Sequence, residues 1–486
     1  MNRRDFIKLN ALLAASSVLP INLFGSGFND YKALVIILLH GGNDSLNMFI
    51  PTNVDKFEEY SKARGILAIK NNKLELPISN GKLALEAGEN NPYYDGGTIV
   101  NSYTKGFYDS EFGIGINPLM PELAYLAKEG NLAVVSNMGT LHEPTTKEDI
   151  AKKRVKLPIY LYSHNSQRAL FYTGNSQNQS SIGWAGHLAD IWGDVNNSSV
   201  YGLNIAIDSA VKMLYGKDTN PLVISNRGPT RYSKVKDEER ILYDKLLQIN
   251  SNNDYKRLYN KLKKSSFKYQ DTLNDDWDSV TLSFNSTNGY GDELFTKLGY
   301  QKLGVKSTEV TGFGLMDKLK AVTKLIQIGK NRGFNREIFF ITQGGYDTHG
   351  NQKVQHARLL RELSCAMYDF NMAIKDLGLS DSVTTFNISD FGRSAGNNGN
   401  GSDHAWGGHY FVLGGAVKGG LYGELPSLEL GGVDDATKKG RLIPKISHTQ
   451  YYSTILNWFG VDEATTLKLF PELSNFSNKN LGFMKV

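Results

Sequence analysis

Acidic and imidazole side chains recur in this sequence directly after apolar segments. Asp44, Asp347 and Asp390 each follow an apolar run by a few residues. Five of the nine histidines lie in turns of the same kind, namely His40, His164, His349, His404 and His409. Carboxylate oxygens together with imidazole nitrogens suit Zn²⁺ or Mn²⁺, whereas Ca²⁺ or Mg²⁺ would be favoured if only carboxylates bound. These residues therefore predict one composite site for a divalent metal.

Two local motifs concentrate these ligand types. One is Asp347-x-His349, and the other is Asp403-His404 followed after four residues by His409. Glycines surround both motifs, and a residue without a Cβ lets the backbone approach an ion or an oxyanion closely. The simpler interpretation is that Asp and Gly only form turns here. The sequence leaves that alternative open.

A different hydrolytic motif competes with the metal site. Residues 392–396 fit the pattern G-x-S-x-G around Ser394, and His40-Gly41-Gly42 is similar to a lipase oxyanion loop. A nucleophile elbow must lead directly into a helix, yet residues 397–402 are rich in Asn and Gly. Each glycine in a helix costs about 1 kcal/mol relative to alanine. A serine esterase using Ser394 is therefore the third hypothesis. Neither phosphate-binding glycine motif of nucleotide enzymes is present.

The segments around these turns predict an α/β fold. Continuous apolar runs are typical of strands buried on both faces, and we expect strands at 33–39, 132–137, 157–162, 337–342 and 383–389. Helical spacing predicts helices at 119–129, 315–331 and 352–377. Strands that alternate with helices indicate a mainly parallel central sheet with helices on both faces. In such sheets ligands bind at the carboxyl ends of the strands.

The composition favours one large globular domain. The 486 residues are 40% hydrophobic and carry a formal net charge of +5, which excludes a disordered chain and a nucleic-acid-binding surface. Cys365 is the only cysteine, so a disulfide framework and a thiolate zinc site are excluded. We expect a single domain over 28–486. Within it, residues 190–310 lack a strand pattern and predict an inserted helical lobe, and 69–109 predicts a surface excursion.

The first 27 residues have the pattern of a twin-arginine signal. Arg3 and Arg4 precede Phe6, Lys8 and a weakly apolar stretch. That stretch is interrupted by polar residues and proline, and a stable membrane span needs about 20 apolar residues. We therefore expect export to the periplasm or the extracellular space through the twin-arginine translocase. Cleavage of the signal and its retention as an anchor both stay open.

Several blocks resemble a known family. His-Gly-Gly-Asn-Asp-Ser-Leu-Asn at 40–47 resembles the opening block of a large family of twin-arginine-exported bacterial proteins, domain of unknown function 1501. Further blocks agree in the expected order at 158–167, 183–186, 346–350, 389–393 and 403–409. The resemblance extends over about residues 34–460.

The family is similar to a distant branch of the alkaline phosphatase and sulfatase superfamily, so the resemblance implies an alkaline phosphatase-like domain. Carried over by position, the resemblance implies metal ligands at Asp44, Asp347, His349, Asp390 and either His404 or His409. It also implies a serine nucleophile, for which Ser163 is our candidate and Ser45 the second choice. The sequence departs from the superfamily at Phe391, where an Asp-His pair would have its histidine.

The resemblance implies an exported metal-dependent hydrolase of phosphate or sulfate esters. In that chemistry the metal neutralises the ester oxygens while Ser163 or a water attacks. Arg393 is expected to clamp the anionic ester, and His164 or His404 to protonate the leaving oxygen. The alternative is a non-catalytic secreted binding or assembly protein with a degenerate site, and Phe391 favours it. No nucleic-acid partner is expected.

Overall fold

The computed structural model describes residues 28–86, 102–180, 182–198, 200–229, 237–248, 254–296 and 314–485. The expected signal segment, residues 1–27, lies outside them. None of the helices that the structure describes combines the length and the apolar character needed to cross a bilayer.

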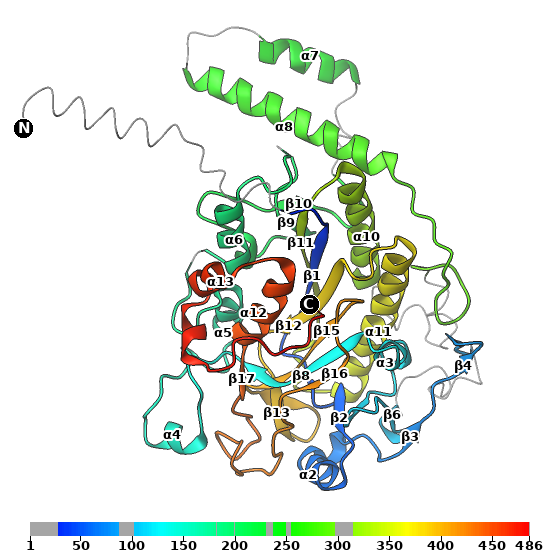
Figure 1. Ribbon diagram of the computed structural model, residues 1–486, viewed down its shortest axis with the longest axis vertical. Helices are drawn as coiled ribbons and strands as arrows, with labels where there is room; N and C mark the ends of the chain where they lie inside the picture. Colours follow the sequence, from blue (N-terminus) through cyan, green and yellow to red (C-terminus); the bar gives the residue numbers. More distant parts are fainter. Residues whose placement is uncertain are drawn as a thin grey trace, which may run out of the picture.

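A large sheet forms the centre of the molecule (Figure 1). In the described residues its strand order is β10-β9-β11-β1-β12-β15-β8-β16, with β17 paired to β8. All neighbouring strands are parallel except for β15, which runs antiparallel to both β12 and β8. The strands are β1 (Lys32–His40), β8 (Leu132–Gly139), β9 (Asn204–Ile207), β10 (Leu222–Ile224), β11 (Arg336–Gly344), β12 (Val383–Ser389), β15 (Gly408–Leu413), β16 (Gly420–Tyr422) and β17 (Ile446–Ser447).

Strand β1 is apolar at successive positions because both of its faces are buried. Val35 and Ile37 point into one hydrophobic core, whereas Leu34 and Ile36 point into a second core on the opposite face. Successive side chains of a strand point to opposite faces, so a strand covered on both sides needs apolar residues at every position.

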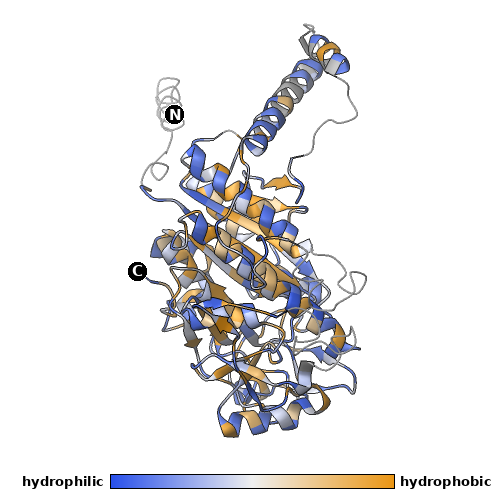
Figure 2. Cartoon of the chain, turned by 90° about the vertical axis from the view of Figure 1, so that its right-hand side faces the viewer, coloured by the Kyte–Doolittle hydropathy of each residue, from blue (hydrophilic) through white to orange (hydrophobic). Residues whose placement is uncertain are grey.

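Helices cover both faces of the sheet. The first core contains side chains of α3 (Pro121–Lys128), α10 (Gly314–Arg332) and α11 (Gln352–Asp376). The second contains side chains of α5 (His164–Thr173), α6 (Trp184–Trp192), α12 (His448–Phe459) and α13 (Glu463–Leu469). The predicted α/β fold with a mainly parallel sheet is confirmed. The hydropathy colouring of Figure 2 shows the apolar strands between these layers.

Smaller elements extend the end of the sheet where the strands finish. A second sheet has the order β2-β7-β6-β3, formed by Phe49–Pro51, Ile114–Ile116, Phe107–Asp109 and Lys73–Leu74. The other elements are α2 (Val54–Arg64), α4 (Lys147–Ala151) and the strand pairs β4/β5 (Ile78–Ser79, Lys82–Leu83) and β13/β14 (Arg393–Asn397, Ser402–His404). Ile69 and Phe107 are buried, so the described part of 69–109 is not only a surface excursion.

Two expectations from the sequence are wrong. Residues 157–162 form turns that lead into α5 rather than a strand, and Leu157 and Leu161 pack beside the buried Trp406. Residues 190–310 contain β9 and β10 of the central sheet, which have only four and three residues and are too short to produce a strand pattern.

The helical part of the expected lobe is present. Helices α7 (Asp237–Gln248) and α8 (Asp254–Ser279) extend away from the main body (Figure 1), and both are largely hydrophilic (Figure 2). The end of α8 nearest the body rests against α10, where the Lys324 ammonium lies 4.6 Å from the centre of the Trp277 ring.

Candidate metal centre

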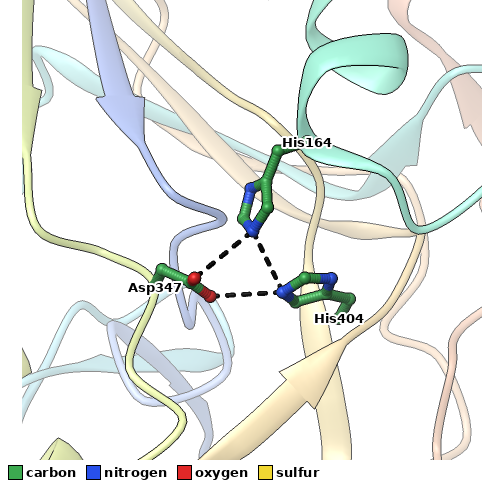
Figure 3. Close-up of side chains that lie close together, drawn as sticks. All are labelled: His164, Asp347 and His404. Atoms are coloured by element: carbon green, nitrogen blue, oxygen red, sulfur yellow. Dashed lines mark hydrogen bonds and ion pairs between the residues drawn. The ribbon is translucent and has the colours of Figure 1, made fainter.

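Three imidazoles and one carboxylate converge at the carboxyl end of the central sheet. His164 is the first residue of α5, Asp347 and His349 lie in the loop after β11, and His404 ends β14. The Nε2 atom of His404 lies 3.0 Å from Nε2 of His164 and 2.8 Å from Nε2 of His349. Figure 3 shows His164, Asp347 and His404 pointing toward one another. The loops thus bring four side chains from distant parts of the chain to one point.

The Asp347 carboxylate completes the group. Its Oδ1 atom lies 3.2 Å from Nε2 of His404 and 3.0 Å from Nε2 of His349, and its Oδ2 atom lies 3.4 Å from Nε2 of His164. His164, Asp347 and His404 each direct one ligand atom to within 4.8 Å of the other two, and His349 lies against Asp347 and His404.

Hydrogen bonds on the far side of each ring fix the tautomers. Every Nδ1 atom faces an oxygen that accepts a hydrogen bond: Asp390 Oδ2 at 2.7 Å from His164, the Tyr162 carbonyl at 2.9 Å from His404, and Asp403 Oδ1 at 3.3 Å from His349. A neutral imidazole has a single proton, so a donating Nδ1 leaves Nε2 with a lone pair. In these tautomers Nε2 of His404 faces both Nε2 of His164 and Nε2 of His349, beside the Asp347 carboxylate.

This arrangement fits a bound divalent cation. Unprotonated nitrogens at 2.8–3.0 Å cannot bond to each other, and a cation between them would remove the repulsion. In a tetrahedral site with metal–nitrogen distances of about 2.0–2.1 Å, ligand atoms lie roughly 3.3 Å apart. The observed contacts span 2.8–3.4 Å. His164, His404 and Asp347 offer two imidazole nitrogens and one carboxylate oxygen, which are ligand types suited to Zn²⁺.

Extra protons on the histidines would be a second way to satisfy these contacts. Burial lowers the pKa of His404, and the charges of His164 and Arg393 act in the same direction. A doubly protonated His404 is therefore disfavoured at neutral pH.

Arg393 holds the Asp347 carboxylate. Burial opposes ionisation of Asp347, but the hydrogen bond and charge of Arg393 keep the pKa of this carboxyl below its ordinary value. Nη1 of Arg393 donates to Oδ1 at 2.7 Å, and Nη2 donates to the Ser402 carbonyl. The Arg393 side chain is fully buried. The structure thus directs Arg393 at Asp347, and the expected clamp on a substrate is not visible.

Asp44, expected as a metal ligand, lies outside the converging group. Its carboxylate is fully buried and accepts hydrogen bonds from Arg64 and Gln352. The Arg64 guanidinium, at the end of α2, compensates its charge. Gly41 and Gly42 have positive φ angles, and a side chain at Gly41 would collide with the Asp347 backbone. This segment therefore packs closely under the metal-binding loop rather than contributing a ligand.

Asp390 acts on the site through His164. Its buried carboxylate accepts from Nδ1 of His164 and, at 3.4 Å, from Nη1 of Arg168. We therefore correct the sequence assignment, because Asp390 orients a ligand instead of being one. The residues after the strands did not point to Arg168, which lies one helical turn after His164 and so on the same face of α5.

His409 is a satisfied core histidine. It lies within β15, and its Nδ1 accepts from the Asn137 backbone N–H at 3.1 Å. Burial lowers its pKa to about 4. His409 is not part of the converging group. Of the two histidines proposed as the last metal ligand, only His404 lies in that group.

The three candidate serines have different surroundings. Ser163 is exposed at the N-cap of α5, next to His164, with its Oγ 3.4 Å from Ser166 Oγ. Ser45 is buried and its Oγ accepts from the His409 backbone N–H. Ser394 is buried and lies in strand β13, not at a turn into a helix. The esterase elbow at Ser394 is therefore wrong.

Phe391 forms an apolar wall under two of the ligands. Its ring centre lies 4.8 Å from that of His164 and 4.7 Å from that of His404, and the side chain is buried. The residue that looked like a missing ligand therefore supports the imidazoles by packing.

The family comparison agrees with the sequence blocks. Residues 330–466 match the family described as protein of unknown function (DUF1501), which confirms the predicted resemblance for the blocks at 346–350, 389–393 and 403–409. The three earlier blocks lie outside the matched residues. The match includes Asp347, His349 and His404, whereas His164 lies before it. No curated protein matches the chain.

The chain is similar to several solved structures at low identity. They include a protein in the alkaline phosphatase superfamily from Vibrio parahaemolyticus (9% identity, 90% of this chain and 69% of that one, TM-score 0.37). The lipoteichoic acid synthase LtaP from Listeria monocytogenes matches at 8% identity over 94% and 78%, with a TM-score of 0.35. A sulfatase from Pseudoalteromonas sp. matches at 10% over 94% and 70%, with a TM-score of 0.32. These TM-scores lie below 0.5, so the likenesses carry no argument about activity.

Replacing Asp390 by asparagine tests the orientation of His164. The amide removes the charge that fixes the His164 tautomer, and loss of such a partner typically weakens metal binding by about 10–100-fold. We expect that loss for Zn²⁺ in a competition titration with a chromogenic chelator. Asp369→Asn is the matched control, because Asp369 is another buried carboxyl that accepts from a backbone N–H, of Phe295, and has no contact with the site. Equal Zn²⁺ affinity in Asp390→Asn and the wild type would contradict the assignment.

Proposed function

We propose that the protein is an exported metal-dependent hydrolase of phosphate or sulfate esters. The observation that carries the proposal is the convergence of Nε2 of His164 and Nε2 of His404 with the Asp347 carboxylate, with His349 against two of these groups. His164, His349, His404 and Asp347 would hold one ion, in place of the larger set expected from the sequence. A bound Zn²⁺ or Mn²⁺ would supply charge for the ester oxygens and lower the pKa of an attacking group.

The residues around the group supply positioning and charge. Arg393 keeps Asp347 ionised and in place, and Asp390 and Asp403 orient two of the imidazoles. The Arg168 side chain is 18% exposed beside His164, where its positive charge favours an anionic ester. Because Nε2 of His164 and of His404 would be used as ligands, we no longer assign either residue the role of proton donor.

A non-catalytic binding or assembly protein stays the second candidate, and one observation favours it. Each of the three carboxylates that were expected to share a metal has an arginine: Asp44 pairs with Arg64, Asp347 with Arg393 and Asp390 with Arg168. The acidic charge of the region is therefore balanced by side chains alone.

Removing one ligand should separate the two candidates. In His404→Ala we expect bound metal to fall below about one tenth of the wild-type content, since three ligands hold an open site less tightly than four. Hydrolysis of aryl phosphates and aryl sulfates should fall at least about 100-fold. His187→Ala, which removes an exposed histidine of α6, is the matched control. Metal is measured by elemental analysis of protein purified without chelator. A wild-type protein that is metal-free and inert on both esters would favour the binding protein.

Ser163→Ala tests the nucleophile. Ser163 contributes no ligand to the converging group, so metal content should stay at the wild-type value while turnover falls at least about 100-fold. Ser166→Ala, three residues further along α5, is the control for a change of hydroxyl at the same surface. Full turnover in Ser163→Ala would assign the attack to Ser45 or to a water molecule.

Export is proposed from Arg3 and Arg4, which lie outside the described residues. Substituting both by lysine removes the paired guanidinium groups of the signal and should leave the protein in the cytoplasmic fraction of the producing bacterium. Wild-type protein should appear outside the cytoplasm in the same fractionation. Periplasmic recovery of the double lysine variant at the wild-type level would contradict transport by the twin-arginine translocase.

A further inference from the structure

The turn before α5 holds two tyrosines in a left-handed backbone conformation. Tyr160 has a φ angle of 51° and Tyr162 has a φ angle of 71°. A positive φ is a rare conformation for a bulky side chain, and it persists only where the surrounding structure holds it in place. Glycine would adopt it without the clash of a Cβ atom. Contacts made by the tyrosine side chains must therefore compensate for the strain of this turn.

The Tyr162 backbone lies between two residues of the candidate metal centre. Its carbonyl accepts a hydrogen bond from Nδ1 of His404 at 2.9 Å. Two residues further along the chain, His164 begins α5. A change of the Tyr162 backbone to an ordinary extended or helical conformation would turn the carbonyl away from His404 and alter the entry of the chain into α5. One strained residue therefore positions both imidazoles.

The ring of Tyr162 is held by Arg441. The guanidinium carbon of Arg441 lies 4.1 Å from the centre of the ring, and both side chains are half-buried. A guanidinium over the face of an aromatic ring is attracted to it, and more strongly where water is excluded. Leu161 and Tyr162 also pack against the apolar cluster that contains Trp406 and Ile443. These contacts are the compensation that the turn requires.

Arg441 belongs to a loop that one buried carboxylate holds together. The side chain of Asp435 accepts hydrogen bonds from the backbone N–H groups of Gly431, Thr437, Gly440 and Arg441 at distances of 2.8–3.0 Å. The backbone of Arg441 is therefore fixed, and its guanidinium reaches Tyr162 from a defined position.

We propose that Arg441 is a positioning residue of the candidate metal centre and that it acts through Tyr162. The inference rests on the proposed function, because it assigns a role toward the same metal. The Arg441 guanidinium holds the Tyr162 ring, and the left-handed backbone directs the Tyr162 carbonyl at Nδ1 of His404. That hydrogen bond keeps the His404 proton on Nδ1 and leaves the Nε2 lone pair available to a metal.

Replacing Arg441 tests these contacts through metal binding. In Arg441→Gln we expect the affinity for Zn²⁺, measured by competition with a chromogenic chelator, to fall about tenfold or more, as for other partners that orient a ligating histidine. Arg441→Lys keeps a cation near the ring and should recover part of the affinity. Arg332→Gln is the matched control, because the guanidinium of Arg332, the last residue of α10, also lies over a tyrosine ring, that of Tyr201. Unchanged Zn²⁺ affinity in Arg441→Gln would overturn the inference.

Two substitutions of Tyr162 separate the ring from the backbone. Tyr162→Gly removes the ring and relieves the strain of the positive φ angle, whereas Tyr162→Ala removes the ring but keeps the Cβ atom. We expect Tyr162→Gly to bind Zn²⁺ more tightly than Tyr162→Ala, and both to bind it more weakly than the wild type. Equal affinities of the two variants would overturn the role of the left-handed backbone. The same pair replaces Arg441→Gln if that variant does not fold.

A measurement without metal follows the hydrogen bond itself. In metal-free protein that is isotope-labelled at the histidine nitrogens, the NMR shifts of the His404 ring report which nitrogen carries the proton, and His404→Ala identifies the signals. The wild type should carry it on Nδ1, and Arg441→Gln should shift the population toward Nε2. An unchanged tautomer would overturn the route through Tyr162. A wild-type protein that binds no Zn²⁺ would contradict the proposed function, and the tautomer would still decide whether Arg441 positions His404.

Discussion

The candidate site depends on hydrogen bonds made by the outer nitrogens of three histidines. Asp390, Asp403 and the Tyr162 carbonyl each face an Nδ1 atom, which leaves Nε2 of His404 facing Nε2 of His164 and Nε2 of His349. Without a cation the lone pairs of neighbouring Nε2 atoms repel each other. A divalent cation between them would remove that repulsion. Every other feature of the region either holds these rings, as the packing of Phe391 does, or holds the Asp347 carboxylate that completes the group.

Electrostatic balance around the site comes from arginines rather than from a second ion. Three buried or half-buried carboxylates at strand ends would repel each other, but each lies against its own guanidinium. Pairing a buried charge in this way is needed, because an unpaired buried charge is strongly destabilising. In the proposed metal site the affinity for a metal would therefore depend on imidazoles more than on acidic charge.

The candidate site lies at the carboxyl edge of the sheet, where loops from several strands meet. Strands β11, β1 and β12 are parallel neighbours, so the loops that follow them start side by side. Asp347 and His349 lie in the loop that follows β11, and Asp390 follows β12.

The amino-acid sequence predicts the long central strands, their carboxyl ends and the residue types found there, but not the short strands β9 and β10. Continuous apolar runs such as 33–39 are buried on both faces, and the polar residues after them necessarily lie at the carboxyl edge. Tertiary structure alone decided which of those residues are ligands. Asp390 and His164 are 226 residues apart, and Arg64 reaches Asp44 from a neighbouring helix. The position of a residue at the end of a strand fixes where its Cα atom lies. The role of its side chain depends on which hydrogen-bond donor or acceptor the tertiary structure places beside its polar group.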